Sequence, residues 1–216
     1  SRGYATFLTN HDQDRVVDQL GHDRRKARLA AAVLLSSPGV PFVYYGEEIG
    51  MRGSKPDPDL RTPMQWSASH AAGFTDGTPW RDPQRDFEEV NVAKQDGRVD
   101  SLLEWYRDLV AARTALPSLS ADAETVIVDV PETEAIVLIR RDAGDRGVVV
   151  VLNFSHDASA DVVVDAPSSP LPRGNRTLVP VVGSASLAEI TVRRKGAAFG
   201  NLGLIAPGGA VIYRVE

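Results

Sequence analysis

The segment Phe7-Leu8-Thr9-Asn10-His11-Asp12-Gln13-Asp14-Arg15 places a strand directly before a cluster of polar and charged side chains. The β-prone run Tyr4 to Thr9 stops where the Asn, His, Asp and Arg residues begin. α/β enzymes place their chemistry at the carboxyl ends of strands, so this segment indicates an active site. A site that begins so early in the chain is expected to need residues from an upstream segment.

Strand and helix patterns alternate as far as Pro117, which predicts an α/β arrangement for this part of the chain. Asp23 is expected to cap the first helix, and Pro38-Gly39 is expected to end it. A polar segment from Arg52 to Arg98 is too rich in Pro, Asp and Gly to be regular, and a loop of this length is usually functional. The predicted elements are a strand over Tyr4–Thr9, a helix over Asp23–Ser37, a strand over Pro41–Tyr45 and a helix over Asp100–Ala115.

After Pro117 the pattern changes to short runs of Val, Ile and Leu separated by turn signals such as Pro207-Gly-Gly. This spacing is typical of an antiparallel β-sandwich. We therefore predict two domains, 1–116 and 117–216. The predicted strands are Thr125–Val130, Glu134–Arg140, Gly147–Phe154, Ala160–Asp165, Arg176–Val179, Ile190–Val192 and Ala210–Val215.

Composition narrows the functional classes. The chain has 216 residues, of which 43% are hydrophobic and 25% charged, with a net charge of -5. Basic residues are scattered among acidic ones, so there is no electrostatic case for nucleic acid or membrane partners, and small polar substrates fit better. The absence of cysteine excludes disulfides and thiolate metal sites, and no run has transmembrane length. The compartment stays open, with the cytoplasm favoured over secretion.

Local features leave two interpretations of Asp12. Beside His11, with Arg15 three residues on, it is a carboxylate whose charge state a cation and an imidazole can set, and such a group can stabilise positive charge. Alternatively, Asp12 is a cap or a structural ion pair where the strand turns into a loop.

Four further motifs follow in order. After Asn10-His11-Asp12 come, in order, Pro38-Gly-Val-Pro-Phe-Val-Tyr-Tyr-Gly-Glu-Glu-Ile-Gly-Met51, Arg61-Thr-Pro-Met-Gln-Trp66, Ala72-Gly-Phe-Thr-Asp-Gly-Thr-Pro-Trp80 and Asn91-Val92. This series resembles the α-amylase family of glycoside hydrolases, in its α-glucosidase and oligo-1,6-glucosidase branch. The resemblance is close over residues 4 to about 116 and general over the remainder.

The resemblance implies the last two strands and helices of a (β/α)8 barrel followed by an antiparallel β-sandwich domain. Family members retain anomeric configuration by means of a carboxylate nucleophile and a carboxylic acid. In the family, both residues lie upstream of the position that matches Asp12, and neither has a counterpart in this chain. The resemblance therefore also implies that a missing N-terminal barrel segment is a partner of this chain. By resemblance, Asp12 supports the transition state and His11 binds the same sugar unit of an α-glucan or oligosaccharide.

The remaining side chains each have two interpretations. Arg15 either contacts the leaving-group sugar or forms a surface or intradomain salt bridge. Arg61, by resemblance, closes the non-reducing end of the glucose pocket with an upstream aspartate, or else it holds the loop. At most one of Glu47 and Glu48 is expected to approach substrate.

Aromatic and metal-binding side chains complete the candidates. Trp66, Phe74 and Trp80 are expected to pack the loop rather than stack on sugars. Neither the histidines His22, His70 and His156 nor the aspartates Asp57, Asp59, Asp76 and Asp82 show metal-site spacing, so we expect no metal and no cofactor.

Three functions are compatible with the sequence. The first is the C-terminal part of a retaining α-glycoside hydrolase that is inactive without its upstream strands. The second is a non-catalytic carbohydrate-binding or structural module. The third is a transglycosylase or isomerase, such as a trehalose or isomaltulose synthase.

Overall fold

The computed structural model describes residues 4–216, which form two compact units. The α/β unit comprises Ala5–Leu34 and Pro41–Asp108. The β unit comprises Leu35–Val40 and Leu109–Glu216, together with Tyr4. The units divide inside the second long helix, whereas the predicted domain boundary lies just after that helix, at Pro117.

The strands of the α/β unit are shorter than predicted. β1 (Ala5–Phe7) pairs with β2 (Val40–Phe42) in a two-stranded sheet, and α1 (Val16–Gln19) and α2 (Arg24–Ser36) connect them. The prediction of strands at these two places is confirmed, but each strand ends before its polar or aromatic flank. The segment that follows β1 is therefore loop, and it carries the Asn-His-Asp sequence.

A capping side chain lies at the start of each long helix. As predicted, the Asp23 Oδ1 atom accepts hydrogen bonds from the backbone N–H groups of Arg25 (2.8 Å) and Lys26 (3.2 Å) at the start of α2. The Ser101 hydroxyl accepts from the Glu104 N–H (3.1 Å) at the start of α5 (Leu102–Ala115). Such caps satisfy backbone donors that lack a partner within the helix.

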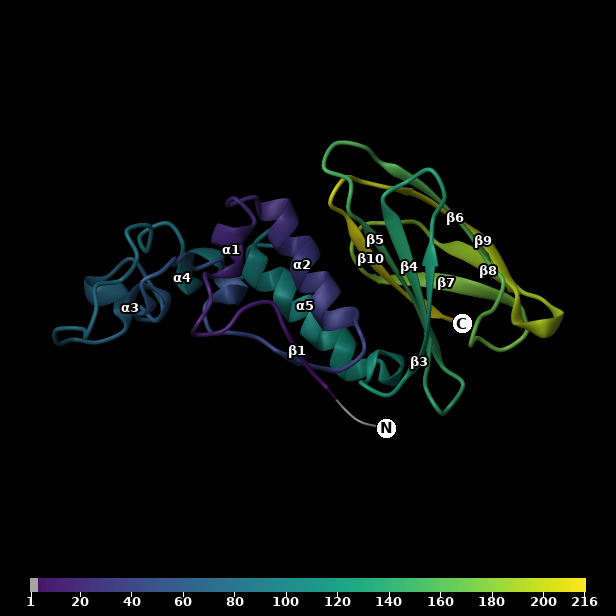
Figure 1. The fold of residues 1–216 in the computed structure, drawn as a ribbon, viewed down its shortest axis with the longest axis horizontal. Coiled ribbons are helices and arrows are strands. Elements are labelled where there is room, and N and C mark those ends of the chain that lie inside the picture. The colour runs from purple at the N-terminus through teal and green to yellow at the C-terminus, as the bar shows by residue number, and fades with distance from the viewer. Residues whose placement is uncertain (1–3) are drawn as a thin grey trace. The chain divides into compact units, whose positions relative to one another are not determined.

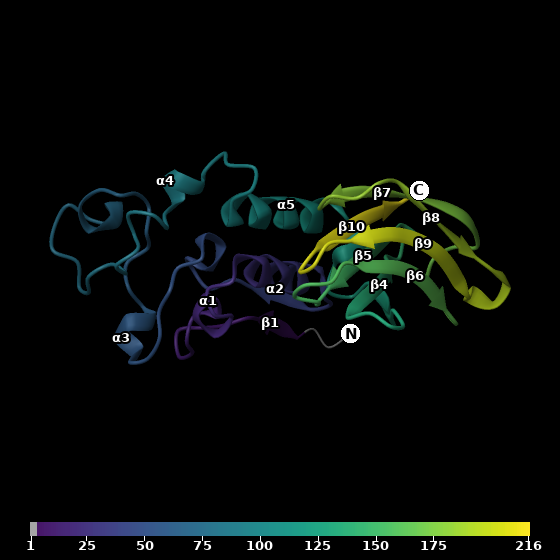
Figure 2. The ribbon, with the colours of Figure 1, turned by 90° about the horizontal axis from the view of Figure 1, so that it is seen from above.

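Helices α2 and α5 run side by side (Figures 1 and 2). The indole Nε1 of Trp105 donates to the Arg28 carbonyl (2.8 Å), and the Arg28 guanidinium lies 4.2 Å from the indole centroid. Ala27 and Ala31 are buried on α2, where their small side chains allow close packing.

The segment between Arg52 and Arg98 is more regular than predicted. It contains the short helices α3 (Asp57–Leu60), η2 (His70–Gly73) and α4 (Val92–Gln95), and η1 (Glu47–Ile49) precedes it. Asn91 caps α4 by accepting from the Lys94 N–H (2.8 Å). These helices have only three or four residues each, which is too short for a helical periodicity to be visible in the sequence.

The β unit is one antiparallel sheet of eight strands in the order β3-β4-β5-β10-β7-β8-β9-β6. The antiparallel prediction is confirmed, with one additional strand, β9, in which glycines interrupt the apolar pattern. One core draws on all eight strands, and β6 contacts both β3 and β4, so the sheet curls over itself. The strands are β3 (Glu124–Asp129), β4 (Ala135–Arg141), β5 (Gly147–Asn153), β6 (Ala160–Ala166), β7 (Gly174–Val182), β8 (Ala188–Val192), β9 (Ala198–Ile205) and β10 (Ala210–Val215).

Every residue of β5 is buried, because the strand is covered on both faces. Its inward residues Val149 and Val151 belong to the core, and the short helix η3 (Pro117–Leu119) contacts β4 and β5. A strand covered on both sides needs a continuous apolar run rather than an alternating one, and Gly147–Leu152 has that pattern. A second short helix, η4 (Arg194–Gly196), joins β8 to β9.

Two arginines of the β unit bind backbone carbonyls instead of carboxylates. Arg140 is fully buried, and its burial, with Arg113 nearby, lowers its pKa to about 10. Their donors satisfy carbonyls at the end of α2 that have no partner within that helix. The acceptors are the Ser36 and Ser120 carbonyls and the Thr125 hydroxyl for Arg140, and the Leu35, Ser37 and Gly39 carbonyls for Arg113.

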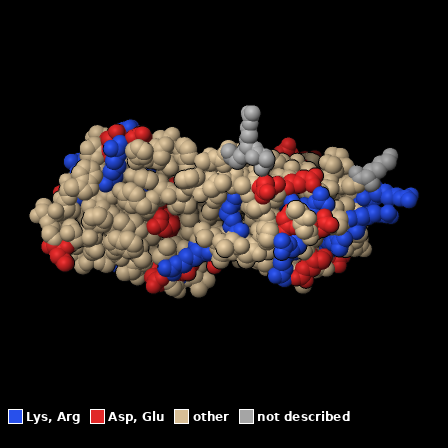
Figure 3. Space-filling view, turned by 90° about the horizontal axis from the view of Figure 1, so that it is seen from below, with Lys and Arg blue, Asp and Glu red and all other residues tan. Residues whose placement is uncertain are grey.

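Charged groups of both signs lie next to one another on the face drawn in Figure 3. Among residues 4–216, none of the helices has the length and apolar character that a membrane span requires.

Candidate active site

The loop after β1 presents the Asn-His-Asp sequence to solvent. The Asn10 Oδ1 atom accepts a hydrogen bond from the Asp12 N–H (2.9 Å), which is a turn that asparagine side chains favour. This turn leaves the His11 and Asp12 side chains 62% and 59% exposed, with His11 Nε2 3.3 Å from Asp12 Oδ2. The structure thus places both predicted residues together, accessible to a ligand.

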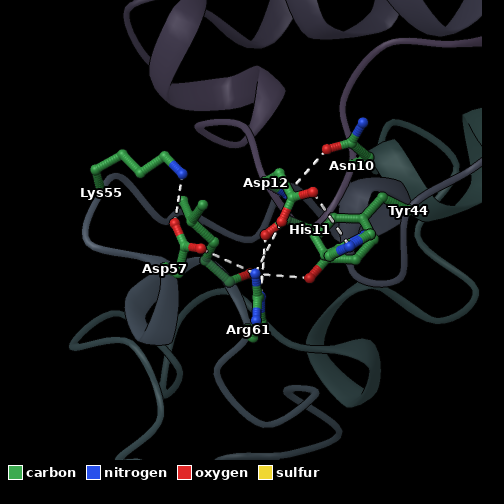
Figure 4. A network of polar contacts seen from close by, with 8 residues as sticks. Asn10, His11, Asp12, Tyr44, Lys55, Asp57 and Arg61 are labelled. Atoms are coloured by element: carbon green, nitrogen blue, oxygen red, sulfur yellow. Dashed lines mark hydrogen bonds and ion pairs between the residues drawn. The ribbon is translucent and has the colours of Figure 1, made fainter.

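Arg61 lies against the same loop, although it is 49 residues away from Asp12 (Figure 4). Its Nη2 atom is 2.9 Å from Asp12 Oδ1 and 3.0 Å from Asp57 Oδ2, and its Nε donates to the His11 carbonyl (3.0 Å). Asp57 also accepts from the Lys55 ammonium, and this hydrogen bond lowers the Asp57 pKa. One guanidinium therefore joins the Asp12 carboxylate and the backbone of its loop to the turn that begins at Asp57.

These ion pairs add little to stability. The side chains of Arg61, Asp12 and Asp57 are 39%, 59% and 44% exposed. Exposed pairs contribute about 0–1 kcal/mol, because water screens them and long side chains lose entropy. The cluster therefore contributes little to the stability of the fold.

Two tyrosines after β2 fix the segment that carries Arg61. The Tyr44 hydroxyl donates to the Leu60 carbonyl (3.2 Å), and the Tyr45 hydroxyl donates to the Thr62 carbonyl (2.7 Å). These acceptors lie on either side of Arg61 in the chain, so the tyrosines fix the position of the Arg61 backbone.

Arg15 is buried, with 2% exposure, beneath this arrangement. Its guanidinium lies 4.5 Å from the Tyr44 ring centroid and 4.7 Å from that of Tyr45, and it donates to the Tyr45 (2.6 Å) and Leu60 (3.2 Å) carbonyls. Burial lowers its pKa. Of the two roles that the sequence allows, this geometry supports an internal one, in which Arg15 holds the segment before Arg61 through carbonyls rather than through a salt bridge.

Glu47 is a buried carboxylate between β1 and α5. It is 3% exposed, and its Oε1 accepts from the Tyr106 hydroxyl (2.8 Å), while the Thr9 hydroxyl lies 3.5 Å from its Oε2. Burial raises the Glu47 pKa to about 7 and also raises that of Glu48. Glu47 thus has no access to a substrate, and its partner Tyr106 carries no signal of this contact in the sequence.

The raised pKa of Glu47 predicts a pH-dependent stability. Because the folded chain binds the proton more tightly than the unfolded chain does, this stabilisation is present at low pH and is lost as pH rises through 7. Between pH 8.5 and 5.5 the wild type should gain about 2 kcal/mol in unfolding free energy relative to Glu47→Gln. Urea unfolding followed by tryptophan fluorescence measures this difference. Equal pH dependence in both proteins would contradict it.

Gly46 is required at the turn before Glu47. Its φ is 79°, and an added Cβ would lie 2.2 Å from the Met51 sulfur. No other residue fits such a contact without displacing Met51. The Gly46-Glu47 turn is therefore specified by backbone shape as well as by burial.

The loop aromatics are only partly covered. Trp66, Phe74 and Trp80 are 50%, 50% and 62% exposed. Among residues 4–216, no group of three or more His, Cys, Asp or Glu side chains is arranged to hold a metal ion. His22, one of the histidines without metal-site spacing, has a φ of 60°, and its Nε2 lies 2.6 Å from Asp18 Oδ1.

A shallow hollow of about 260 Å³ borders the Asn-His-Asp loop. Phe7 and Phe42 contribute its apolar walls and are 48% and 59% exposed. The hollow is lined by Ala5, Phe7, Thr9, Asn10, Phe42, Val43 and Tyr44.

Comparison with known proteins places this geometry in a family. The family model described as the alpha amylase catalytic domain matches residues 2–122. This chain belongs to the α-amylase family of glycoside hydrolases. The matched residues include the loop of Asp12, the Arg61 segment and both long helices. This match agrees with the resemblance carried by the sequence motifs.

Curated relatives of this α-amylase family member come from several bacteria. It is 29% identical to a probable oligo-1,6-glucosidase 2 of Bacillus subtilis over 72% of this chain and 35% of that protein. It is 42% identical to the alpha-amylase SusG of Bacteroides thetaiotaomicron over 54% of this chain and 17% of that protein. The chain thus spans about a third or less of these relatives.

Solved structures extend the similarity to the β unit. An alpha-amylase from H. orenii matches with a TM-score of 0.75 and 30% identity, covering 98% of this chain and 40% of that one. The MutB double mutant in complex with isomaltulose matches with a TM-score of 0.74 and 25% identity over 98% of this chain and 43% of that one.

Proposed function

We propose that this chain supplies the third carboxylate, Asp12, to a retaining α-glycoside hydrolase that acts on α-glucosidic bonds of oligosaccharides or starch-like glucans. The observation that carries the proposal is the exposed Asp12 carboxylate, held between His11 and Arg61 in the loop that follows strand β1. This is where a (β/α)8 barrel places its chemistry, and family membership gives the reaction class.

The proposed chemistry is electrostatic. Glycoside cleavage passes through a transition state with positive charge on the sugar ring, and a fixed carboxylate stabilises that charge more than the neutral ground state. Asp12 accepts hydrogen bonds from hydroxyls of the distorted sugar unit, and His11 donates a hydrogen bond to the same unit. Arg61, which lies 2.9 Å from Asp12, binds the non-reducing end of that unit.

The nucleophile and the acid/base are proposed to come from residues outside this chain. Asp57 shares Arg61 with Asp12, but Lys55 also binds it, and Glu47 is buried. Neither has the pairing across a scissile bond that the mechanism requires. The exposed apolar surface of β1 and β2, with Phe7 and Phe42, is proposed to pack against the remaining barrel strands. Cofactors, nucleic acids and membranes have no part in this proposal.

The chain alone is expected to show no turnover of p-nitrophenyl α-glucoside above buffer, because it would carry one of three catalytic carboxylates. The measurement is nitrophenol release by folded wild type and by Asp12→Ala. A rate that follows the protein through purification and is lost in Asp12→Ala would contradict the proposal.

Isomerisation is the second candidate. It is supported by the similarity to MutB, whose wild type is a trehalulose synthase. Product analysis on sucrose by the complete catalytic domain separates the two activities. Glucose with fructose indicates hydrolysis, whereas an isomeric disaccharide indicates transfer. A non-catalytic module would give neither product.

A further inference from the structure

We infer that Glu47 is a positioning residue that ties the Asn10–Asp12 segment to helix α5, an inference that rests on the proposed role of Asp12. The tie runs from the Tyr106 hydroxyl through the Glu47 carboxylate to the Thr9 hydroxyl, over 2.8 Å and 3.5 Å. Thr9 is 2% exposed and directly precedes Asn10. Glu47 touches no ligand, so it acts through Thr9.

The location of the tie explains why a carboxylate is buried there. β1 ends at Phe7, and the turn that exposes Asp12 begins at Asn10. Between them, Thr9 is the residue whose side chain points into the α/β unit and meets a partner from another element. An acceptor at Glu47 therefore determines where the strand releases the chain into the loop.

Charged neighbours define how the tie responds to protonation. Facing Glu47 are Tyr106 from α5, Glu48 from η1, Thr9 from the end of β1 and Arg15 from the loop before α1. Burial outweighs the two hydroxyl donors and raises the pKa of Glu47 to about 7. A charged acceptor makes roughly twice as strong a hydrogen bond as a neutral one, so the hold on Thr9 weakens as pH falls through 7.

The test is an NMR titration of this chain between pH 5.5 and 8.5, in a His11→Gln background. That background removes the imidazole, whose own titration would move the same amides. We expect the amide signals of Asn10 and Asp12 to follow the midpoint of the Glu47 side-chain carboxyl, near pH 7. In Glu47→Gln, which keeps the shape of the side chain, the amide signals should stay flat across this range.

Two further variants make the test specific. In Thr9→Val, the Glu47 carboxyl should still titrate, but the amide signals of Asn10 and Asp12 should no longer change with pH. This substitution removes only the hydrogen bond that links the carboxyl to the loop. Glu48→Gln is the matched control, and it should keep the coupling while lowering the shared midpoint, since the Glu48 charge raises the Glu47 pKa.

Loop amides that titrate away from the Glu47 midpoint, or that still titrate in Thr9→Val, would overturn the inference. If Glu47→Gln fails to fold, the Thr9→Val result decides. The titration needs no turnover, so its failure is distinguishable from failure of the proposed hydrolase activity.

Discussion

Asp12→Asn in the complete catalytic domain should lower kcat/KM for an α-glucoside by on the order of 10³-fold, or about 4 kcal/mol. The substitution keeps the size of the side chain and its hydrogen-bonding plane but removes the charge. The loss should appear in kcat as well as in KM, because the charge opposes one that develops only in the transition state. Steady-state kinetics on p-nitrophenyl α-glucoside measure it.

Asp14→Asn is the matched control for this substitution. Asp14 lies two residues further along the same loop and accepts from the Lys55 N–H (2.7 Å), but it does not contact Arg61 or His11 through any contact described in residues 4–216. The kcat/KM of Asp14→Asn should change less than about threefold, because the amide keeps an oxygen that can accept the Lys55 N–H. A loss below tenfold in Asp12→Asn, or an equal loss in both variants, would make Asp12 a structural residue.

Arg61→Ala is expected to lower kcat/KM on maltose by roughly 30- to 1,000-fold, corresponding to about 2–4 kcal/mol for a charged contact in a closed site. Arg61→Lys should restore only part of this, because an ammonium does not replace a planar guanidinium that contacts two groups at once. Folding should change little, since the pairs with Asp12 and Asp57 are exposed.

Arg81→Ala separates charge from position in this experiment. Arg81 pairs with Asp59, which lies on the same short helix as Asp57, and not with Asp12. Its removal should leave maltose kinetics nearly unchanged. The same assays on long amylose address the mode of attack. If wild type cleaves internal bonds of amylose faster than maltose, Arg61 does not close the non-reducing end.

Features that depend on neighbours in sequence could be predicted. Asp23 caps its helix as expected, and the Ser101 cap and the Asn10 turn that exposes His11 and Asp12 likewise depend on side chains a few residues from the N–H groups that they bind. The apolar run of β5 likewise indicates a buried strand, because its length and its valines favour a strand over a helix.

Features that depend on packing could not be predicted. The contact between Glu47 and Tyr106 joins residues 59 positions apart, and Arg61 reaches Asp12 across 49 positions. The motif marks Arg61 as important, but it carries no information on which carboxylate Arg61 meets. In β9, Gly200 and Gly203 break the apolar alternation, so the strand is recognised only from its pairing with β6 and β8.

The central claim is that the Asp12 carboxylate acts on charge in the transition state. Its most direct test is the affinity of the complete catalytic domain for a cationic iminosugar and for glucose, in wild type and in Asp12→Asn. We predict that the iminosugar affinity falls in parallel with kcat/KM, while glucose affinity changes far less, because only the former carries the positive charge. Equal losses for both ligands would contradict this role for Asp12.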